Sequence, residues 1–543
     1  RNFEYFSEDP ILTTEIAGGY IKGIQSKGVG ACMKHFAANN QETRRFFVSA
    51  QIDERTFREI YLCAFEGAIK DAKPWAIMSS YNMINGVQSS VNSELLTHVL
   101  REDWKWVLNC DGNEDSSNSG GMVISDWFGT YDRVDGFKAG LDLSMPNEES
   151  LVEQIVDAVQ SKNLDEKFID IACEHVLNVV LEARKIMEKS KIDESVKFGV
   201  GLGNIEGFLD KQHEIAREIA ENSIVLLKND DSILPLPTKS ETKLRILFVG
   251  KFAKVPHFQG LGSSHIEQYK IDNCYDSSID LLKEKNNGNE DCGVFIDYVE
   301  GFNNENGKTN EELKDQAIQS SEKADIVVVF AATPASQENE NKDLTEMILP
   351  PDEDDLIDEI VKVNKNVVVV LQNGAPVEMP WIDKVKALLE TYFCGEAGGK
   401  ATANILFGLV NPSGHLGETF PIKVSDNPSF YNFPGHGDTV EYSEGIFVGY
   451  RYYDTYNMNV LFPFGYGLSY TTFKYSNIRF RDDHTQILGG FDFIDTDENI
   501  FVLVDVKNVG NVEGKTVAQL YVSDQTGVVV RPMKELKAFE KVN

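Results

Sequence analysis

The sequence has 543 residues, of which 42% are apolar and 25% charged, a composition typical of globular proteins rather than of disordered or fibrous ones. At about 100–200 residues per domain, this length predicts three domains. The 86 acidic residues outnumber the 52 basic ones, which gives a formal net charge of −34. Because such a charge repels nucleic-acid phosphates and anionic lipids, and because no run of about 18 apolar residues is present, we expect no nucleic-acid partner and no membrane partner.

Residues 1–195 repeat a pattern in which a buried strand is followed by an amphipathic helix. The predicted strands are Gly28–His35, Trp75–Asn82, Gly121–Asp126 and Gly140–Pro146, and the predicted helices include Glu54–Ala72, Ser93–Asp103 and Leu151–Ser161. Each strand ends in polar or ionisable residues, which is typical of a parallel (β/α)8-type barrel with its chemistry at the carboxyl ends of the strands. Since a complete barrel has about 250 residues, we interpret this region as the C-terminal part of a barrel and expect the other strands to precede residue 1.

A second α/β domain is predicted at residues 216–425, after a linker at 196–215. Its predicted strands are Leu244–Gly250, Ile326–Ala331, Asn366–Leu371 and Ala387–Phe393, and its helices include Asp352–Val363 and Ala397–Leu409. The strands are dense in Val and Ile on both faces, which favours a mostly parallel sheet covered on both sides, an α/β sandwich.

A third domain is predicted at 466–543, after an irregular connection at 426–465. The segments Phe473–Phe480, Asn499–Val506 and Thr516–Val522 alternate apolar and polar residues with turn residues between them. This pattern indicates a β-sandwich, which has too few strands here to be complete.

Two glycine-containing segments are interpreted as loops. Val107–Gly120 is polar and rich in serine, which predicts a surface insertion at the far end of the barrel. Gly260–Ser264 lacks the lysine of a phosphate-binding loop, so we interpret it as a tight backbone approach to another segment.

The seven cysteines show no zinc-ligand spacing and the nine histidines form no metal-ligand pattern, so we expect no metal and no cofactor. The odd number of cysteines argues against a full disulfide framework. Cys274 and Cys292 are the one pair that we consider as a local bridge.

Asp126 is the sharpest candidate for chemistry. It ends an apolar strand and is followed by Trp127. One interpretation is that Asp126 caps the following helix; the other is catalysis at the carboxyl end of a barrel strand. Because the flat C–H faces of a sugar pack on aromatic rings, Trp127 favours a glycoside site.

Basic and aromatic residues end two neighbouring predicted strands. Lys34 and His35 end one of them, and Arg45 follows in the loop. These donors suit sugar hydroxyls and would keep a nearby Asp ionised, although a hydrogen-bonded loop around a structural His is the alternative. We favour a functional role, because an unpaired Lys at a buried strand end is costly. Tyr81 ends the next strand, either as a sugar contact or as a core residue.

The loop Glu338–Asp343 is a third candidate. In a chain with 86 acidic residues, its sequence alone is best interpreted as a solvated loop.

Nine segments, in their order and spacing, resemble glycoside hydrolase family 3, and the resemblance covers nearly all of the chain. They are Arg1–Pro10, Lys34–Glu42, Met78–Gly86, Val123–Trp127, Gly140–Pro146, Ser223–Asn229, Asn411–Gly414, Glu444–Tyr453 and Phe462–Tyr470. The resemblance implies a multidomain α/β plus β fold: a partial (β/α)8-type barrel, an α/β sandwich and an incomplete fibronectin type III-like β-sandwich.

The resemblance also implies roles for residues of the first domain. Asp126, in the segment VISDW, is the implied nucleophile. Contacts to the sugar are implied for Arg1, Lys34, His35, Arg45, Tyr81 and Trp127. A further sugar-binding Asp, expected early in such a barrel, is not in this chain.

The implied acid/base is a Glu of the second domain, in a motif like E-G-Y-D-R before L-P. The matching segment is Glu340–Leu344, upstream of Leu349-Pro350, so Glu340 is the candidate and Glu338 the reserve. This sequence departs from the motif at Asn341 and Leu344.

The implied activity is that of a retaining, exo-acting β-glucosidase that releases glucose from β-glucosides and cello-oligosaccharides by double displacement. The alternatives are a β-xylosidase or arabinosidase of the same family and a non-catalytic sugar-binding or scaffold component. The implied partner is a small oligosaccharide or glucoside, and a homodimer and a multi-enzyme assembly both remain open. We expect secretion, because polymer-degrading relatives are often exported, with the cytoplasm as the alternative.

Overall fold

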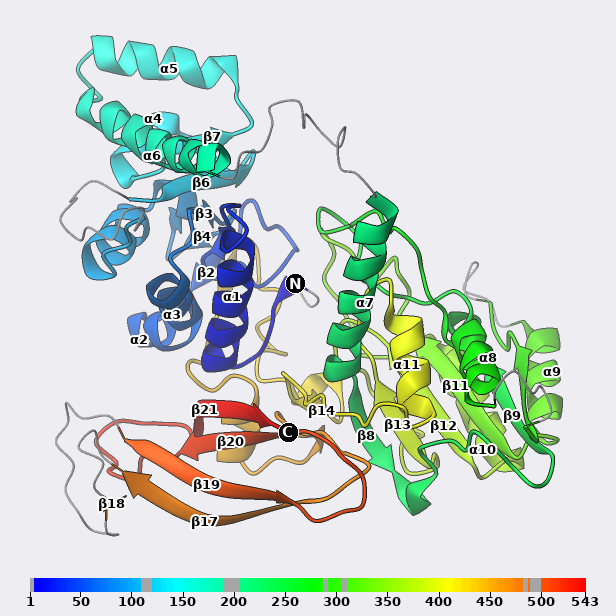
Figure 1. Ribbon diagram of the computed structural model, residues 1–543. Helices are drawn as coiled ribbons and strands as arrows, with labels where there is room; N and C mark the ends of the chain where they lie inside the picture. Colours follow the sequence, from blue (N-terminus) through cyan, green and yellow to red (C-terminus); the bar gives the residue numbers. More distant parts are fainter. Residues whose placement is uncertain are drawn as a thin grey trace.

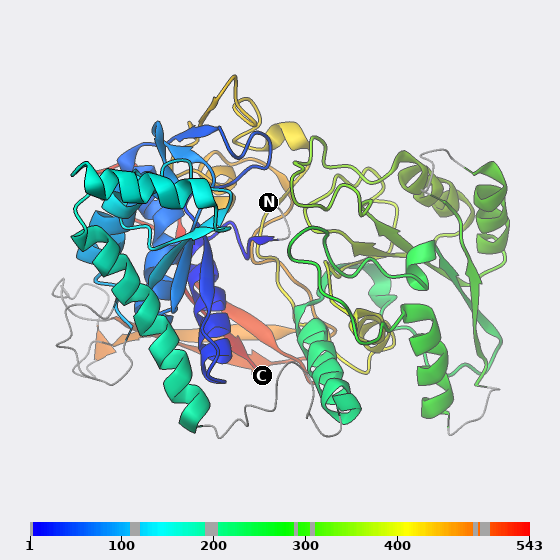
Figure 2. The same ribbon diagram turned by 90° about the horizontal axis from the view of Figure 1, so that it is seen from above.

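The computed structural model describes residues 4–108, 120–189, 205–286, 292–303, 310–481, 487–488 and 500–543. Figure 1 shows three parts: a blue-to-cyan α/β part, a green-to-yellow α/β part and an orange-to-red β part. Figure 2 shows the two α/β parts side by side when the molecule is seen from above. Across the described residues, none of the helices combines the length and apolar character needed to cross a membrane.

The first part is built on a parallel sheet with the strand order β1-β3-β6-β7. These strands are β1 Cys32–Phe36, β3 Ala76–Ser79, β6 Met122–Trp127 and β7 Leu143–Met145. The helices are α1 Pro10–Gln25, α2 Glu54–Thr56, η2 Phe57–Leu62, α3 Cys63–Ala72, η4 Glu94–Asp103, α4 Arg133–Ala139, α5 Glu149–Gln160 and α6 Lys167–Lys189. All four predicted strands and all three predicted helices are confirmed within a few residues at their ends.

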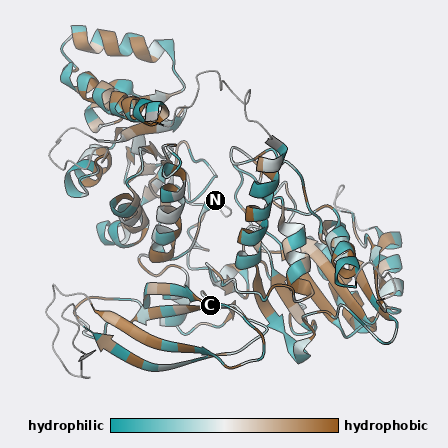
Figure 3. Cartoon of the chain, viewed as in Figure 1, coloured by the Kyte–Doolittle hydropathy of each residue, from teal (hydrophilic) through white to brown (hydrophobic). Residues whose placement is uncertain are grey.

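The second part is a six-stranded sheet with the order β10-β9-β11-β12-β13-β8, in which only the edge strand β8 runs antiparallel to its neighbour. The strands are β8 Val225–Asn229, β9 Leu244–Val249, β10 Val294–Val299, β11 Ile326–Ala332, β12 Val367–Gln372 and β13 Ala387–Glu390. The helices are α7 Ile205–Ser223, α8 Cys274–Lys285, α9 Glu311–Ser321, α10 Pro351–Val363 and α11 Gly398–Leu406. Every residue of β11 and β12 is buried, and Figure 3 shows these strands in the brown of apolar residues.

The third part consists of two small antiparallel sheets. The first is formed by β17 Phe473–Arg481, β18 Ile487–Leu488 and β19 Phe501–Asn508, and the second by β20 Thr516–Val522 and β21 Glu535–Val542. The three strands predicted here are confirmed.

The connection between the second and third parts returns to the first part. It contains β14 Phe420–Pro421, β15 Thr439–Glu441, α12 Tyr450–Thr455 and β16 Val460–Phe462. β15 pairs in parallel with β2 Ser49–Gln51, which in turn pairs with the short hairpin of β4 Met83–Ile84 and β5 Val87–Gln88. The connection is therefore a structural element of the first part, beside the loop that follows β1.

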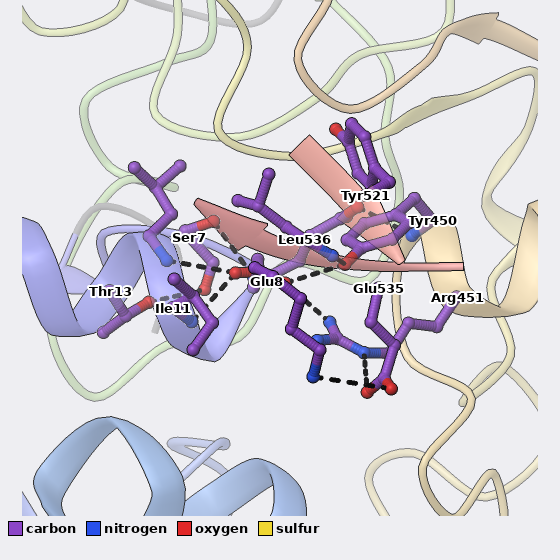
Figure 4. Close-up of polar contacts among 12 residues, drawn as sticks. Ser7, Glu8, Ile11, Thr13, Tyr450, Arg451, Tyr521, Glu535 and Leu536 are labelled. Atoms are coloured by element: carbon purple, nitrogen blue, oxygen red, sulfur yellow. Dashed lines mark hydrogen bonds and ion pairs between the residues drawn. The ribbon is translucent and has the colours of Figure 1, made fainter. Parts of the chain in front are cut away.

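The segment before α1 contacts the second part and the connection, and through Arg451 it reaches the third part. Figure 4 shows the polar contacts near Tyr450, Arg451 and Glu535. Glu8 accepts hydrogen bonds from the N–H and the hydroxyl of Thr419, at 2.8 and 2.7 Å, and from the Tyr450 N–H at 2.7 Å. Asp9 caps α1 and forms an ion pair of 2.9 Å with Arg451, which also lies 3.7 Å from Glu535 on β21.

The local disulfide considered from the sequence is not formed, because Cys274 and Cys292 are both free thiols. Cys274 is buried in the first turn of α8, with its Sγ 3.9 Å from the Ser278 hydroxyl. Cys292 instead donates to the Val294 carbonyl at 3.5 Å.

Candidate active site

Asp126 lies at the carboxyl end of β6, an inner strand of the first sheet. The strand forms because the preceding Met122–Ile124 are apolar and pack between β3 and β7. The next helix, α4, begins at Arg133, and its cap is Asp132, whose side chain accepts from the Asp135 N–H. The capping role that competed with catalysis in the sequence belongs to Asp132, so Asp126 is not that cap.

The Asp126 carboxylate is 8% exposed and contacts His35, Trp127 and Tyr81. His35 Nε2 lies 3.4 Å from Oδ2, and the Trp127 N–H donates to Oδ1 at 2.7 Å. The Tyr81 hydroxyl also bonds to Asp126, and burial together with the Asp126 charge raises the pKa of Tyr81. Tyr81 therefore stays protonated and donates, which favours the ionised form of Asp126.

Lys34 lies less deeply than expected. Its side chain is 41% exposed, and its Nζ is 3.8 Å from Glu4 Oε1. Lys34 is therefore neither buried nor without an anionic partner, so the argument from a costly buried lysine does not hold. The expected contact of Lys34 with a sugar stays a prediction. Lys34 and His35 line a cavity of about 270 Å³ together with apolar residues of α1 and η2.

Arg45 connects the first part to the second. Its Nη1 lies 2.9 Å from Glu42 Oε2 and 2.8 Å from Glu340 Oε1. Its guanidinium also lies over the Tyr81 ring, 4.7 Å from the ring centroid. An unbroken set of contacts therefore runs from Asp126 through Tyr81 and Arg45 to Glu340.

Glu340 is held as a carboxylate. Burial acts to raise its pKa, but hydrogen bonds from Ser263 and Arg45 outweigh burial and lower the pKa to about 2. The Ser263 N–H donates to Oε2 at 2.8 Å. Glu340 is therefore an anion paired with Arg45.

Glu338 points into the second part and is fully buried. Its Oε1 accepts from the Thr333 hydroxyl at 2.8 Å and from the Gly374 N–H at 3.1 Å. Of the two glutamates named from the sequence, Glu340 is thus the one that contacts the first part.

The conformation of the Glu340 loop explains one departure from the family motif. Asn341 has φ of +72°, a left-handed conformation that glycine adopts freely and that asparagine tolerates better than most residues. The tight approach predicted at Gly260–Ser264 is made to this loop: a Cβ on Gly262 would lie 2.4 Å from the Glu340 Cβ. Nothing in the structure explains the departure at Leu344.

The remaining predicted site features have different outcomes. Trp127 is 51% exposed and presents a free aromatic surface beside Asp126. Arg1 lies outside the described residues, as does most of the predicted insertion Val107–Gly120.

Residues 1–179 match the Glycosyl hydrolase family 3 N terminal domain, residues 224–470 the Glycosyl hydrolase family 3 C-terminal domain, and residues 516–543 the Fibronectin type III-like domain. The structure resembles the crystal structure of a GH3 β-glucosidase of Bifidobacterium adolescentis with a TM-score of 0.86 and 38% identity, covering all of this chain and 72% of that one. The chain belongs to glycoside hydrolase family 3. The three-part fold implied by the resemblance is thereby confirmed.

Two further family 3 relatives cover the whole chain. Thermostable beta-glucosidase B of Acetivibrio thermocellus is 48% identical over 545 residues, and an exo-alpha-(1->6)-L-arabinopyranosidase of Bifidobacterium longum is 38% identical over 547 residues. The chain spans 66% of the length of each of these relatives.

Sequence reasoning missed three residues that hold the Glu338–Asp343 loop. Ser263 donates to Glu340, while Glu42 and Asp343 join the two parts through backbone N–H groups. The glycine-rich loop Gly260–Ser264 was the one sequence signal for Ser263. The sequence could not show that this loop contacts Glu340. Glu42 and Asp343 lie within the recognised motifs and carried no separate signal.

Proposed function

We propose that this family 3 protein is a retaining, exo-acting β-glucosidase that releases glucose from the non-reducing ends of β-glucosides and cello-oligosaccharides. The observation that carries the proposal is the contact path from Asp126 to Glu340, which brings carboxylates from two parts of the chain to one site. A retaining glycosidase needs two such groups, one as nucleophile and one as acid/base. The 48% identity to a β-glucosidase supports the choice of substrate.

In the first step, Asp126 attacks the anomeric carbon and forms a glycosyl ester, while the bond to the leaving oxygen breaks. Hydrogen bonds from Tyr81 and the Trp127 N–H hold Asp126 in the ionised form that attack requires. The exposed ring of Trp127 offers an apolar face to the sugar.

Glu340 supplies a proton to the leaving oxygen in this step and removes one from the attacking water in the second. The low pKa of Glu340 means that it is already in the carboxylate form that the second step uses. The first step requires a protonated Glu340, because the leaving oxygen must receive a proton. Glu340 takes up this proton as substrate binds, since a sugar over the site excludes water and disfavours the anion.

A second candidate is an α-L-arabinopyranosidase activity at the same site, favoured by the 38% identical relative of that name. Both reactions would use Asp126 and Glu340 in the same roles. A panel of nitrophenyl β-glucoside, β-xyloside and α-L-arabinopyranoside separates these specificities through kcat/KM.

The proposal is tested by trapping the intermediate with 2,4-dinitrophenyl 2-deoxy-2-fluoro-β-glucoside. We expect one covalent adduct, located on Asp126 by peptide mass spectrometry, and none in Asp126→Asn. An adduct on another residue would contradict the assignment. Absence of both adduct and hydrolysis would favour a sugar-binding role.

A further inference from the structure

The first and second parts of the chain each supply a carboxylate that accepts hydrogen bonds from backbone N–H groups of the other part. Asp343, on the loop of the second part, accepts the Glu42 N–H on Oδ1 at 2.8 Å and the Thr43 N–H on Oδ2 at 2.7 Å. In return, Glu42 Oε2 accepts the Asn341 N–H at 3.0 Å. We call these four residues, Glu42, Thr43, Asn341 and Asp343, the reciprocal clamp.

The clamp is connected to both residues of the Arg45–Glu340 ion pair in the candidate site. Glu42 Oε2, which holds Asn341, also lies 2.9 Å from Arg45 Nη1, and the same Nη1 lies 2.8 Å from Glu340. Glu340 directly precedes Asn341 in the chain. The clamp therefore fixes both partners of the Arg45–Glu340 pair, one from each part.

The polypeptide at the clamp has little regular structure to hold it. Residues 43–47 form successive turns, and residues 338–343 form an irregular loop. Backbone N–H groups in such segments need acceptors when they are buried, and a carboxylate is a stronger acceptor than a neutral oxygen. Glu42 is 5% exposed, so its hydrogen bonds are largely protected from water.

We propose that Asp343 and Glu42 are positioning residues that hold Glu340 over the part of the chain that carries Asp126. The inference rests on the proposed function, since it assigns these residues to the acid/base step. Asp126 and the 42–45 segment belong to the same part, linked through Tyr81 and Arg45. Asp343 thus sets the place of the acid/base relative to the nucleophile through its hydrogen bonds to the 42–43 backbone.

Loss of the clamp should affect proton donation more than nucleophilic attack. A poor leaving group such as phenol needs a placed acid, whereas 2,4-dinitrophenolate leaves without one, and general acid catalysis contributes about 10²–10⁴-fold. In Asp343→Ala we therefore expect kcat/KM for phenyl β-glucoside to fall about 100-fold while that for 2,4-dinitrophenyl β-glucoside changes little. The acid/base variant Glu340→Ala should show the same selectivity.

The matched control is Glu346→Gln, which removes an exposed carboxylate of the same loop region. We expect both of its kcat/KM values to equal those of the unmodified protein. Hydrogen exchange provides a measurement that does not depend on catalytic activity. The Glu42 and Thr43 amides should lose protection in Asp343→Ala, while the amides of β11 should keep theirs. Retained protection of the β11 amides shows that the variant is folded.

The possible results separate the two proposals. If the unmodified protein hydrolyses neither glucoside, the proposed function is wrong, and the positioning role falls with it. If the unmodified protein is active but Asp343→Ala loses activity equally on both substrates, or loses none, the positioning role alone is overturned. Unchanged protection of the Glu42 and Thr43 amides would also overturn it.

Discussion

The ionisation of Glu340 depends on two donors that oppose the effect of burial. Arg45 and the Ser263 N–H lower the pKa of Glu340 to about 2. In Arg45→Met one donor and the positive charge are lost while burial remains, so the pKa should rise toward or above its usual value of 4.5. Carbon-13 NMR of the Glu340 carboxyl in the ligand-free protein measures this directly.

The control for this prediction is the neighbouring Arg44, which is half-exposed and pairs with Asp438 rather than with Glu340. Arg44→Met should leave the titration of Glu340 unchanged. An equal shift of the Glu340 pKa in both variants would mean that overall charge, not the contact with Arg45, controls it.

The pKa of a second carboxyl, that of Glu418, is shifted in the opposite direction. Burial, followed by the Glu8 charge, raises its pKa to about 8, although the Tyr392 hydroxyl donates to it at 3.2 Å. A carboxyl whose folded pKa is raised loses its contribution to stability as the pH rises from about 4.5 through 8, at about 1.4 kcal/mol per pH unit. Between pH 5 and 8, Glu418→Gln should make this dependence shallower and be the more stable protein at pH 8. The raised pKa values of Glu8 and Asp354, both about 6, keep part of the slope.

Thermal unfolding across this pH range checks the prediction, with the exposed Glu322→Gln as the control. The control should follow the unmodified protein at every pH. Parallel pH curves for Glu418→Gln and the unmodified protein would show that Glu418 is ionised in the folded state.

At the scale of single residues, Trp127 and the family resemblance favoured catalysis over capping for Asp126. The structure excludes the capping role, because Asp132 caps α4. The choice between Glu338 and Glu340 needed the structure, although the two residues are only two positions apart. The side chain of Glu338 lies in the core, and that of Glu340 lies against Arg45.

Among the loops, the glycine-rich segment beside Glu340 has no room for a side chain at Gly262. Gly262 has φ of +108°, and a Cβ there would lie 2.4 Å from the Glu340 Cβ. Gly86 also has a positive φ, +85°, but has open space around a Cβ. Gly262→Ala should therefore displace Glu340 and reduce acid-dependent turnover about 10²-fold, whereas Gly86→Ala should cost only the backbone strain of about 1 kcal/mol.

Kinetics with phenyl β-glucoside and denaturant unfolding measure the two effects separately. If both alanine variants lose stability alike and keep their activity, the contact between Gly262 and Glu340 does not position the acid/base.

Elements with a strong local pattern were predictable, and elements defined by distant partners were not. The apolar runs of β11 and β12 are buried on both faces, which is what their sequence predicts. β10, an edge strand of the same sheet, alternates buried and exposed residues and was missed. The three residues of β15 gave no signal at all, because they become a strand only through pairing with β2, far away in the chain.

At the scale of the whole molecule, one buried ion pair joins the first part to the connection and lies beside the third part. Asp9 is fully buried, Arg451 is 3% exposed, and the pair lies next to Glu535 on β21 (Figure 4). Removing one partner of a buried pair leaves an uncompensated charge and typically costs about 3–5 kcal/mol. Arg451→Met should therefore lower the free energy of unfolding by that amount and loosen the third part from the first.

Guanidinium unfolding and hydrogen exchange in β20 and β21 measure these two consequences. Lys22→Met, which breaks the exposed pair of Lys22 with Asp71, should cost less than about 1 kcal/mol and leave exchange in β21 unchanged. The double variant Asp9→Asn with Arg451→Met should recover part of the loss, because it buries no unpaired charge while the asparagine can still cap α1. If the double variant were less stable than Arg451→Met alone, Asp9 would stabilise the junction mainly through its other contacts, such as the hydroxyl of Tyr450 at 2.9 Å, and not through the ion pair.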